Sequence, residues 1–163
     1  MTPERPHDEG YKQPVSVLVV IHTADLHVLL LERADFADHW QSVTGSRDQD
    51  EDLADTARRE VLEETGIDVD DYVLRDWHVT NEYEIFPRWR HRYPPGTTVN
   101  TENVFSLDVG RPVPIRLSTR EHLRYVWLPW KAAAERCFSW SNRDAILALP
   151  DFVLRRASGT DAA

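Results

Sequence analysis

An uninterrupted run of apolar residues, many of them β-branched, extends from Pro14 to His22. Such a run is typical of a strand that is buried on both faces of a sheet. The polar stretch TADLH follows and predicts a hairpin turn into a second apolar strand at Val28–Arg33. A short third strand is expected at Trp40–Val43. The first quarter of the chain is therefore predicted to be mainly β-structure.

After Gly45 the apolar positions recur every three or four residues, which predicts a helix from about Asp52 to Thr65. Prolines and a glycine mark a later loop, RHRYPPGTTVNTE. The other expected elements are strands at Val73–Thr80, Glu82–Trp89, Asn103–Asp108 and Leu123–Leu128, and helices at Lys131–Phe138 and Asn142–Leu154. This order predicts an α/β fold with a mixed sheet flanked by helices.

The length of 163 residues suits one domain, expected over residues 11–154. The polar ends, residues 1–10 and 155–163, lack periodicity and are expected to be flexible tails. The single cysteine, Cys137, excludes an internal disulfide, and its apolar surroundings favour a buried side chain over a nucleophile. No leader pattern or membrane-length apolar run is visible, so we expect a cytoplasmic protein.

The formal net charge is −9, from 19 basic and 28 acidic residues. This balance argues against nucleic acid as the main partner, because a polyanion would be repelled. A small phosphorylated ligand stays compatible, since a metal ion and a few basic side chains can reverse the potential locally. We expect a small-molecule substrate, no nucleic-acid or membrane partner, and a monomer or small homo-oligomer.

Three glutamates stand out when the predicted helix is projected at about 100° per residue. Glu60, Glu63 and Glu64 fall side by side, and Glu64 lies within the apolar arc. An unpaired carboxylate there would lose its hydration, and like charges three and four residues apart repel each other. A divalent cation with oxygen ligands, Mg²⁺ or Mn²⁺, removes both costs. The alternative interpretation is an ordinary solvated acidic face.

The residues around this helix resemble the sequence box of the Nudix hydrolases. Agreement by chance at every constrained position is about 10⁻¹⁰ per starting position, which disfavours the solvated face. The resemblance implies an α/β/α sandwich with a mixed sheet, and cleavage of a nucleoside diphosphate linked to another group with Mg²⁺ or Mn²⁺. The matching positions are Gly45, Glu51, Arg59, Glu60, Val61, Glu63, Glu64, Gly66 and Ile67.

Within the box the resemblance implies metal binding by Glu60 and Glu64. It implies that Glu63 is a further ligand or the group that activates water. Arg59 lies four residues before Glu63 and is expected to orient it by an ion pair. Many relatives have a glycine where this chain has Asp50, a difference that concerns only the conformation of the loop.

The ends of the helix carry signals of their own. Asp50 and Asp52 are expected to accept hydrogen bonds from free amides at the start of the helix. Gly66 suits the left-handed position after the last turn, and Ile67 can pack back onto that turn.

Segments outside the box resemble a bacterial Nudix subfamily that releases pyrophosphate from dihydroneopterin triphosphate in folate synthesis. The matching segments are YKQPVSVLVVI, HWQSVTGS, EYEIFPRWRHRYPPGTTVNTE, EHLRYVWL and SWSNRDAI. The resemblance implies that Glu121 is a metal ligand, although the residue by itself would be taken for a surface glutamate. It also implies substrate contacts by Lys12, Arg33, Thr44, Tyr83, Glu84, Ile85, Phe86 and Ser139.

The chemistry of these residue types suits such contacts. Lys12 and Arg33 can neutralise triphosphate oxygens, whereas Tyr83 and Phe86 can form a wall for a flat pterin. Glu84 can accept hydrogen bonds from the two adjacent N–H donors of a guanine-like edge. The alternative is that the apolar residues of the YEIF segment are ordinary strand core.

Two other functions fit the box. One is a broader pyrophosphohydrolase for deoxynucleoside triphosphates or oxidised nucleotides, which would share the metal site and differ in the base pocket. The other is a Nudix-like ligand-binding module without catalysis. The complete set of box glutamates argues against such a module, as does the lack of a DNA-binding segment beyond the short cluster RWRHR.

Overall fold

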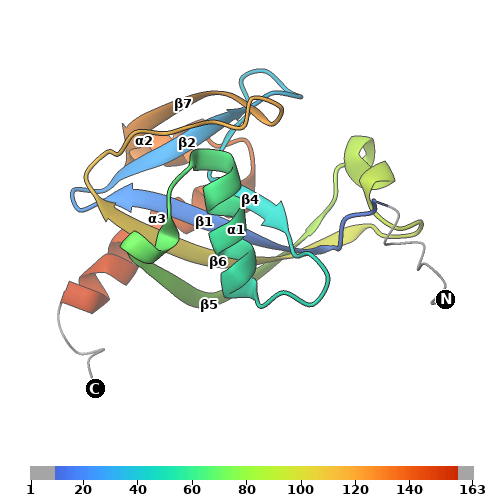
Figure 1. Cartoon of the computed structure of the whole chain (residues 1–163), viewed down its shortest axis with the longest axis horizontal. Helices are drawn as coiled ribbons and strands as arrows, with labels where there is room; N and C mark the ends of the chain where they lie inside the picture. The colour runs from blue at the N-terminus through green and yellow to red at the C-terminus, as the bar shows by residue number, and fades with distance from the viewer. Residues whose placement is uncertain (1–9, 158–163) are drawn as a thin grey trace.

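The structure is a computed structural model that describes residues 10–157 (Figure 1). Its centre is a seven-stranded sheet in the order β3-β2-β1-β6-β5, with β4 paired to β1 and β7 paired to β2. Strands β1 and β6 are parallel, and the other described pairs are antiparallel. The strands are β1 (Val15–Thr23), β2 (His27–Arg33), β3 (Trp40–Gln41), β4 (Val43–Ser46), β5 (Val73–Glu84), β6 (Val99–Gly110) and β7 (His122–Pro129).

Among residues 10–157, three α-helices cover the two faces of this sheet. They are α1 (Leu53–Thr65), α2 (Trp130–Arg136) and α3 (Trp140–Ala157). Two 3₁₀ helices are also present: η2 (Val69–Asp71) between α1 and β5, and η3 (Pro87–Arg92) between β5 and β6. Figure 1 shows α1 in front of the sheet and α2 and α3 behind it. The predicted α/β class and the α/β/α layering with a mixed sheet are therefore confirmed.

The side chains of β1 explain the three layers, because they alternate between two hydrophobic cores. Val19 packs with Val61 of α1 on one face, and Leu18 packs with Ile146 of α3 on the other. A strand covered on both faces has to be apolar at consecutive positions, which is the pattern that predicted its burial.

The strand predicted at Trp40–Val43 is divided into β3 and β4 at Ser42. The Ser42 amide donates a hydrogen bond to Asn142 Oδ1 at 2.8 Å, and its hydroxyl accepts one from Asn142 Nδ2 at 2.9 Å. The start of α3 thus binds the backbone that would otherwise continue the strand.

The prediction of two separate strands between Val73 and Trp89 is wrong. A single strand, β5, runs to Glu84 through an irregularity at His78, where φ is 55°. Beyond it, η3 replaces the predicted strand because Pro87 has no N–H for a neighbouring strand and its fixed φ suits the start of a helical turn. Strand β6 begins at Val99, inside the predicted loop.

Helix α3 runs through Pro150, as predicted, and is longer than predicted at both ends, from Trp140 to Ala157. A proline inside a helix removes one backbone hydrogen bond, but tertiary packing outweighs that loss here. Phe152 stacks on Trp77 of β5, with ring centroids 4.0 Å apart.

Residues 155–157, which were predicted to belong to the C-terminal tail, are part of α3. The rest of the predicted tails, apart from Gly10, lies outside the described residues. Within residues 10–157, no helix combines the length and apolar character needed to cross a membrane.

Candidate active site

Helix α1 holds its three glutamates at different depths. The side chain of Glu64 is 2% exposed and Glu60 is buried, whereas 54% of the Glu63 side chain is exposed. The prediction that Glu64 projects from the apolar arc is confirmed. Gly66 has a left-handed conformation, with φ 76°, and Ile67 is buried in the core, as predicted.

The start of α1 is organised differently from the prediction. Asp52 makes no capping hydrogen bond with its side chain. Instead Glu51 accepts hydrogen bonds from the Asp48 amide at 2.9 Å and from the Thr56 hydroxyl at 3.1 Å. The left-handed residue of the preceding loop is Gln49, with φ 50°, one position before Asp50.

Gly45 on β4 is a direct neighbour of the Glu60 carboxyl group. A Cβ atom at this position would overlap Glu60 Cδ and both carboxylate oxygens. Strand β4 therefore needs a glycine because the carboxylate occupies the space of a side chain. Close approach to the glutamate, rather than a turn, accounts for this residue of the box.

We expect Gly45→Ala to lower kcat about 10²-fold, because the added methyl group displaces Glu60. The fold should be retained, since the end of a flexible side chain can move. Steady-state kinetics and circular dichroism test both statements. Gly96→Ala is the control for a glycine-to-alanine change, because no atom of the described residues lies within 4 Å of the added Cβ, although the φ of Gly96 is positive. An active Gly45→Ala enzyme would contradict the role given to this contact.

Arg59 connects several parts of the box. Its Nε and Nη2 donate to the two oxygens of Glu51 at 2.9 and 2.8 Å, and its Nη1 donates to Glu60 at 2.9 Å. The contact with Glu63 is longer, at 3.5 Å. The predicted ion pair with Glu63 is present, but the shorter bonds show that Arg59 mainly positions Glu60 and Glu51. The hydrogen bonds from Arg59 lower the pKa of Glu51 to about 2.

A group of possible metal ligands lies at the buried end of this array. Ligand atoms of Glu64, Glu121 and His122 are all within 4.8 Å of one another. Glu60 lies beside Glu64, and Glu64 Oε2 has no hydrogen-bond partner within residues 10–157. Burial, followed by the negative charges of Glu60 and Glu121, raises the pKa of Glu64 well above its ordinary value.

These features fit a hard divalent cation. Carboxylate oxygens are the preferred ligands of Mg²⁺ and Mn²⁺, and a positive ion would offset both the burial and the mutual repulsion of the glutamates. The acidic cluster is therefore suited to a divalent metal ion.

His122 was not predicted as part of the site. It is buried at the start of β7, with its Nε2 3.5 Å from Glu64 Oε1 and 3.4 Å from Gln41 Nε2. Burial and the nearby Arg33 lower its pKa to about 4, so the ring is neutral near pH 7. In the sequence, His122 is distinguished only by its position next to Glu121, and a histidine beside a glutamate does not by itself indicate a site.

A cavity of about 1420 Å³ extends from this cluster. Every residue predicted to contact the substrate lines it, namely Lys12, Arg33, Thr44, Tyr83, Glu84, Ile85, Phe86 and Ser139. Arg59, Glu60, Glu64 and Glu121 also line it, whereas Glu63 is absent from its walls. The structure thus brings most of the predicted residues together and leaves Glu63 outside.

The cavity has a basic side close to the glutamates. Arg33 forms a bidentate pair with Asp35 at 2.8 Å and donates to Gln41 at 3.1 Å. Burial and the adjacent Arg92 lower the pKa of Lys12. These fixed cations can neutralise the phosphates of a ligand whose other end occupies the rest of the cavity.

An aromatic cluster lines another part of the cavity. Phe86 lies 5.4 Å from Trp89 and 6.4 Å from Phe138 between ring centroids. The guanidinium of Arg33 lies over the Trp89 ring at 4.4 Å. Phe86 is 44% exposed, so it is not the strand-core residue that the alternative interpretation predicted, whereas Ile85 is buried. Trp89 and Phe138 were not predicted as part of the site.

Comparison with known proteins agrees with this arrangement. The model of the NUDIX domain family matches residues 12–149. The chain belongs to the Nudix family, and it is an enzyme of that hydrolase class.

Its curated relatives carry one name. The chain is 49% identical over 142 residues to the dihydroneopterin triphosphate diphosphatase of Escherichia coli K12, covering 85% of this chain and 93% of the relative. It is 42% identical over 139 residues to the enzyme of that name from Haemophilus influenzae, with 83% and 87% coverage. The solved structure of the E. coli dihydroneopterin triphosphate pyrophosphohydrolase superposes with a TM-score of 0.81 at 48% identity, over 89% of this chain and 98% of that one.

Proposed function

We propose that this protein hydrolyses dihydroneopterin triphosphate to dihydroneopterin monophosphate and pyrophosphate in the cytoplasm, with Mg²⁺ as cofactor. One observation carries the proposal: a single cavity joins the buried glutamates to a basic side and to an aromatic cluster. Its dimensions and polarity suit a flat ring at one end and a triphosphate at the other. The names of the curated relatives support the same substrate.

In this proposal Glu60, Glu64 and Glu121 hold the cation, and Lys12 and Arg33 bind phosphate oxygens. A bound divalent cation supplies charge neutralisation and makes a water molecule more acidic. Fixed side chains contribute position and electrostatic stabilisation, which dominate phosphoryl-group chemistry.

Arg59 keeps the Glu60 carboxylate oriented toward the cavity. Glu63 was expected to be a ligand or to activate water. Its exposure and its place outside the cavity instead favour a supporting role through Arg59.

The test is a substrate panel in Mg²⁺ with pyrophosphate release as the measurement. We expect kcat/KM for dihydroneopterin triphosphate to exceed the values for dATP and 8-oxo-dGTP by at least about tenfold. A preference for either nucleotide would support the broader pyrophosphohydrolase instead. A failure to release pyrophosphate from any triphosphate would support a ligand-binding module without catalysis.

A further inference from the structure

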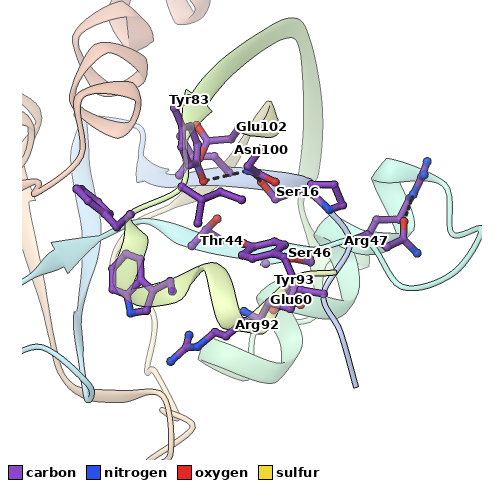
Figure 2. Close-up of a pocket in the computed structure, with 18 of the residues that line it drawn as sticks. Ser16, Thr44, Ser46, Arg47, Glu60, Tyr83, Arg92, Tyr93, Asn100 and Glu102 are labelled. Carbon is purple, nitrogen blue, oxygen red and sulfur yellow. Dashed lines mark hydrogen bonds between the residues drawn. The ribbon is translucent and has the colours of Figure 1, made fainter. Parts of the chain in front are cut away.

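The inner wall of the cavity holds polar side chains that the glutamate cluster does not use. They come from three adjacent strands: Ser16 on β1, Tyr83 on β5, and Asn100 and Glu102 on β6. Figure 2 shows these four side chains gathered together, with Thr44 between them and Glu60. The strand register explains the grouping, because Glu102 pairs with Ser16 and Asn100 pairs with Tyr83.

Glu102 is the unusual member of this group. The residue is buried with 4% exposure, and its Oε1 atom has no hydrogen-bond partner among residues 10–157. Burial raises its pKa to about 7, and the groups that offset this cost, Ser141 and Asn81, are neutral. In the described part of the chain, the neighbouring Asn100 Oδ1 also has no hydrogen-bond partner, although the Asn100 amide nitrogen donates to Ser16 at 2.8 Å and to Tyr83 at 3.0 Å. Buried acceptors of this kind need a donor, which a ligand in the cavity can supply.

The chemistry of a carboxylate defines the ligand group that would fit. An ionised carboxylate accepts two hydrogen bonds from adjacent N–H donors. The 2-amino-4-oxo edge of a pterin presents such a pair, a ring N–H beside an amino group, and guanine presents the same pair. The corresponding edge of adenine places an acceptor nitrogen beside its amino group, which a carboxylate repels.

The other acid of this region, Glu84, is less suited to the task. Its side chain is 77% exposed and is paired with Arg90 at 2.7 Å. The earlier expectation that Glu84 accepts from a guanine-like edge therefore lacks the geometry that Glu102 provides.

We propose that Glu102 is the specificity-determining residue that accepts the paired N–H donors of the pterin ring, with Asn100 beside it. This inference rests on the proposed function. The contact with Glu102 orients the substrate with its ring against β6 and its triphosphate toward the glutamates of α1. Glu102 contacts the part of the substrate that does not react, so its loss should weaken binding more than turnover.

The test compares Glu102→Gln with wild type at about pH 8.5, where the wild-type carboxyl group is ionised. Kinetics are measured with dihydroneopterin triphosphate, dGTP and dATP, and the dissociation constant of unphosphorylated dihydroneopterin is measured by fluorescence. We expect kcat/KM for the pterin and for dGTP to fall about 10- to 100-fold, mainly through KM, and the pterin dissociation constant to rise by a similar factor. Activity on dATP should stay within about threefold.

Two further variants make the outcome specific. Glu82→Gln makes the same change on the adjacent strand, at an exposed residue outside the cavity, and should behave as wild type. Equal losses on dATP would assign Glu102 a structural role, and unchanged pterin binding would exclude the contact. A loss in Glu84→Gln without a loss in Glu102→Gln would return the role to Glu84. If wild type prefers dGTP to the pterin, the proposed function fails while the dGTP comparison still tests Glu102.

Discussion

Replacing Glu64 by glutamine is expected to lower kcat at least about 10³-fold, the largest effect of any single change in the site. Glu64 is the most deeply buried of the cavity carboxylates and belongs to the group that can hold a cation. Glutamine keeps the size of the side chain but removes the charge that a divalent ion requires. Pyrophosphate release in saturating Mg²⁺ measures the loss.

A second measurement separates metal binding from folding. Without metal, Glu64→Gln should unfold at a higher temperature than wild type, because it removes a carboxyl group whose ionisation is opposed by burial and by Glu60 and Glu121. Addition of Mg²⁺ should raise the unfolding temperature of wild type and have a much smaller effect on the variant. Glu82→Gln serves as the control for loss of one acidic charge. Near-normal turnover by Glu64→Gln would disprove its assignment as a ligand.

The second large effect is expected for Arg59→Met, which should lower kcat about 10²-fold and destabilise the fold by about 2 kcal/mol. The change removes the hydrogen bonds that hold Glu51 and Glu60 and leaves both carboxylates without their cation. Kinetics and urea unfolding measure the two losses. Glu63→Gln is the matched comparison, since it removes only the 3.5 Å contact of Arg59 and should have a smaller effect on both quantities.

The same variant has a defined pH dependence. Hydrogen bonds from Arg59 hold the pKa of Glu51 at about 2, below its ordinary value of 4.5. A lowered carboxyl pKa contributes stability above pH 4.5, and this contribution is lost as the pH falls through 2. The difference in unfolding free energy between wild type and Arg59→Met should therefore shrink from about pH 4.5 toward pH 2. A difference that stays constant over this range would show that the Glu51 pair does not account for the stabilisation.

Local sequence patterns located the central part of the site correctly. The period of a helix follows from its backbone geometry, so the sequence alone placed Glu64 inside the apolar arc of α1. The same holds for the buried strand β1 and for the left-handed Gly66. The residues of the box also identified the family, because their spacing combines several independent requirements. One of these requirements is a glycine at position 45. Only the structure explains it, because the Glu60 carboxyl group occupies the space of a side chain there.

Local patterns failed where a neighbouring segment changed the backbone. Strand β5 continues through the irregularity at His78 because β6 pairs with it on both sides. The strand predicted at Trp40–Val43 is interrupted at Ser42 because Asn142 of α3 binds the backbone there. In each case a tertiary contact outweighs the local preference of the sequence for helix, strand or turn, and a single sequence does not reveal that contact.

The sequence by itself determined the glutamate helix, the class of fold and, through its resemblance to the Nudix box, the class of hydrolase. Only the tertiary structure decided that Glu63 lies outside the cavity, that His122 lies against Glu64, and that Glu102 is buried with a free acceptor. The reason is physical. Positions around one helix are fixed by local geometry, whereas the burial of a polar residue on a strand depends on which distant strands pair with it and in which register.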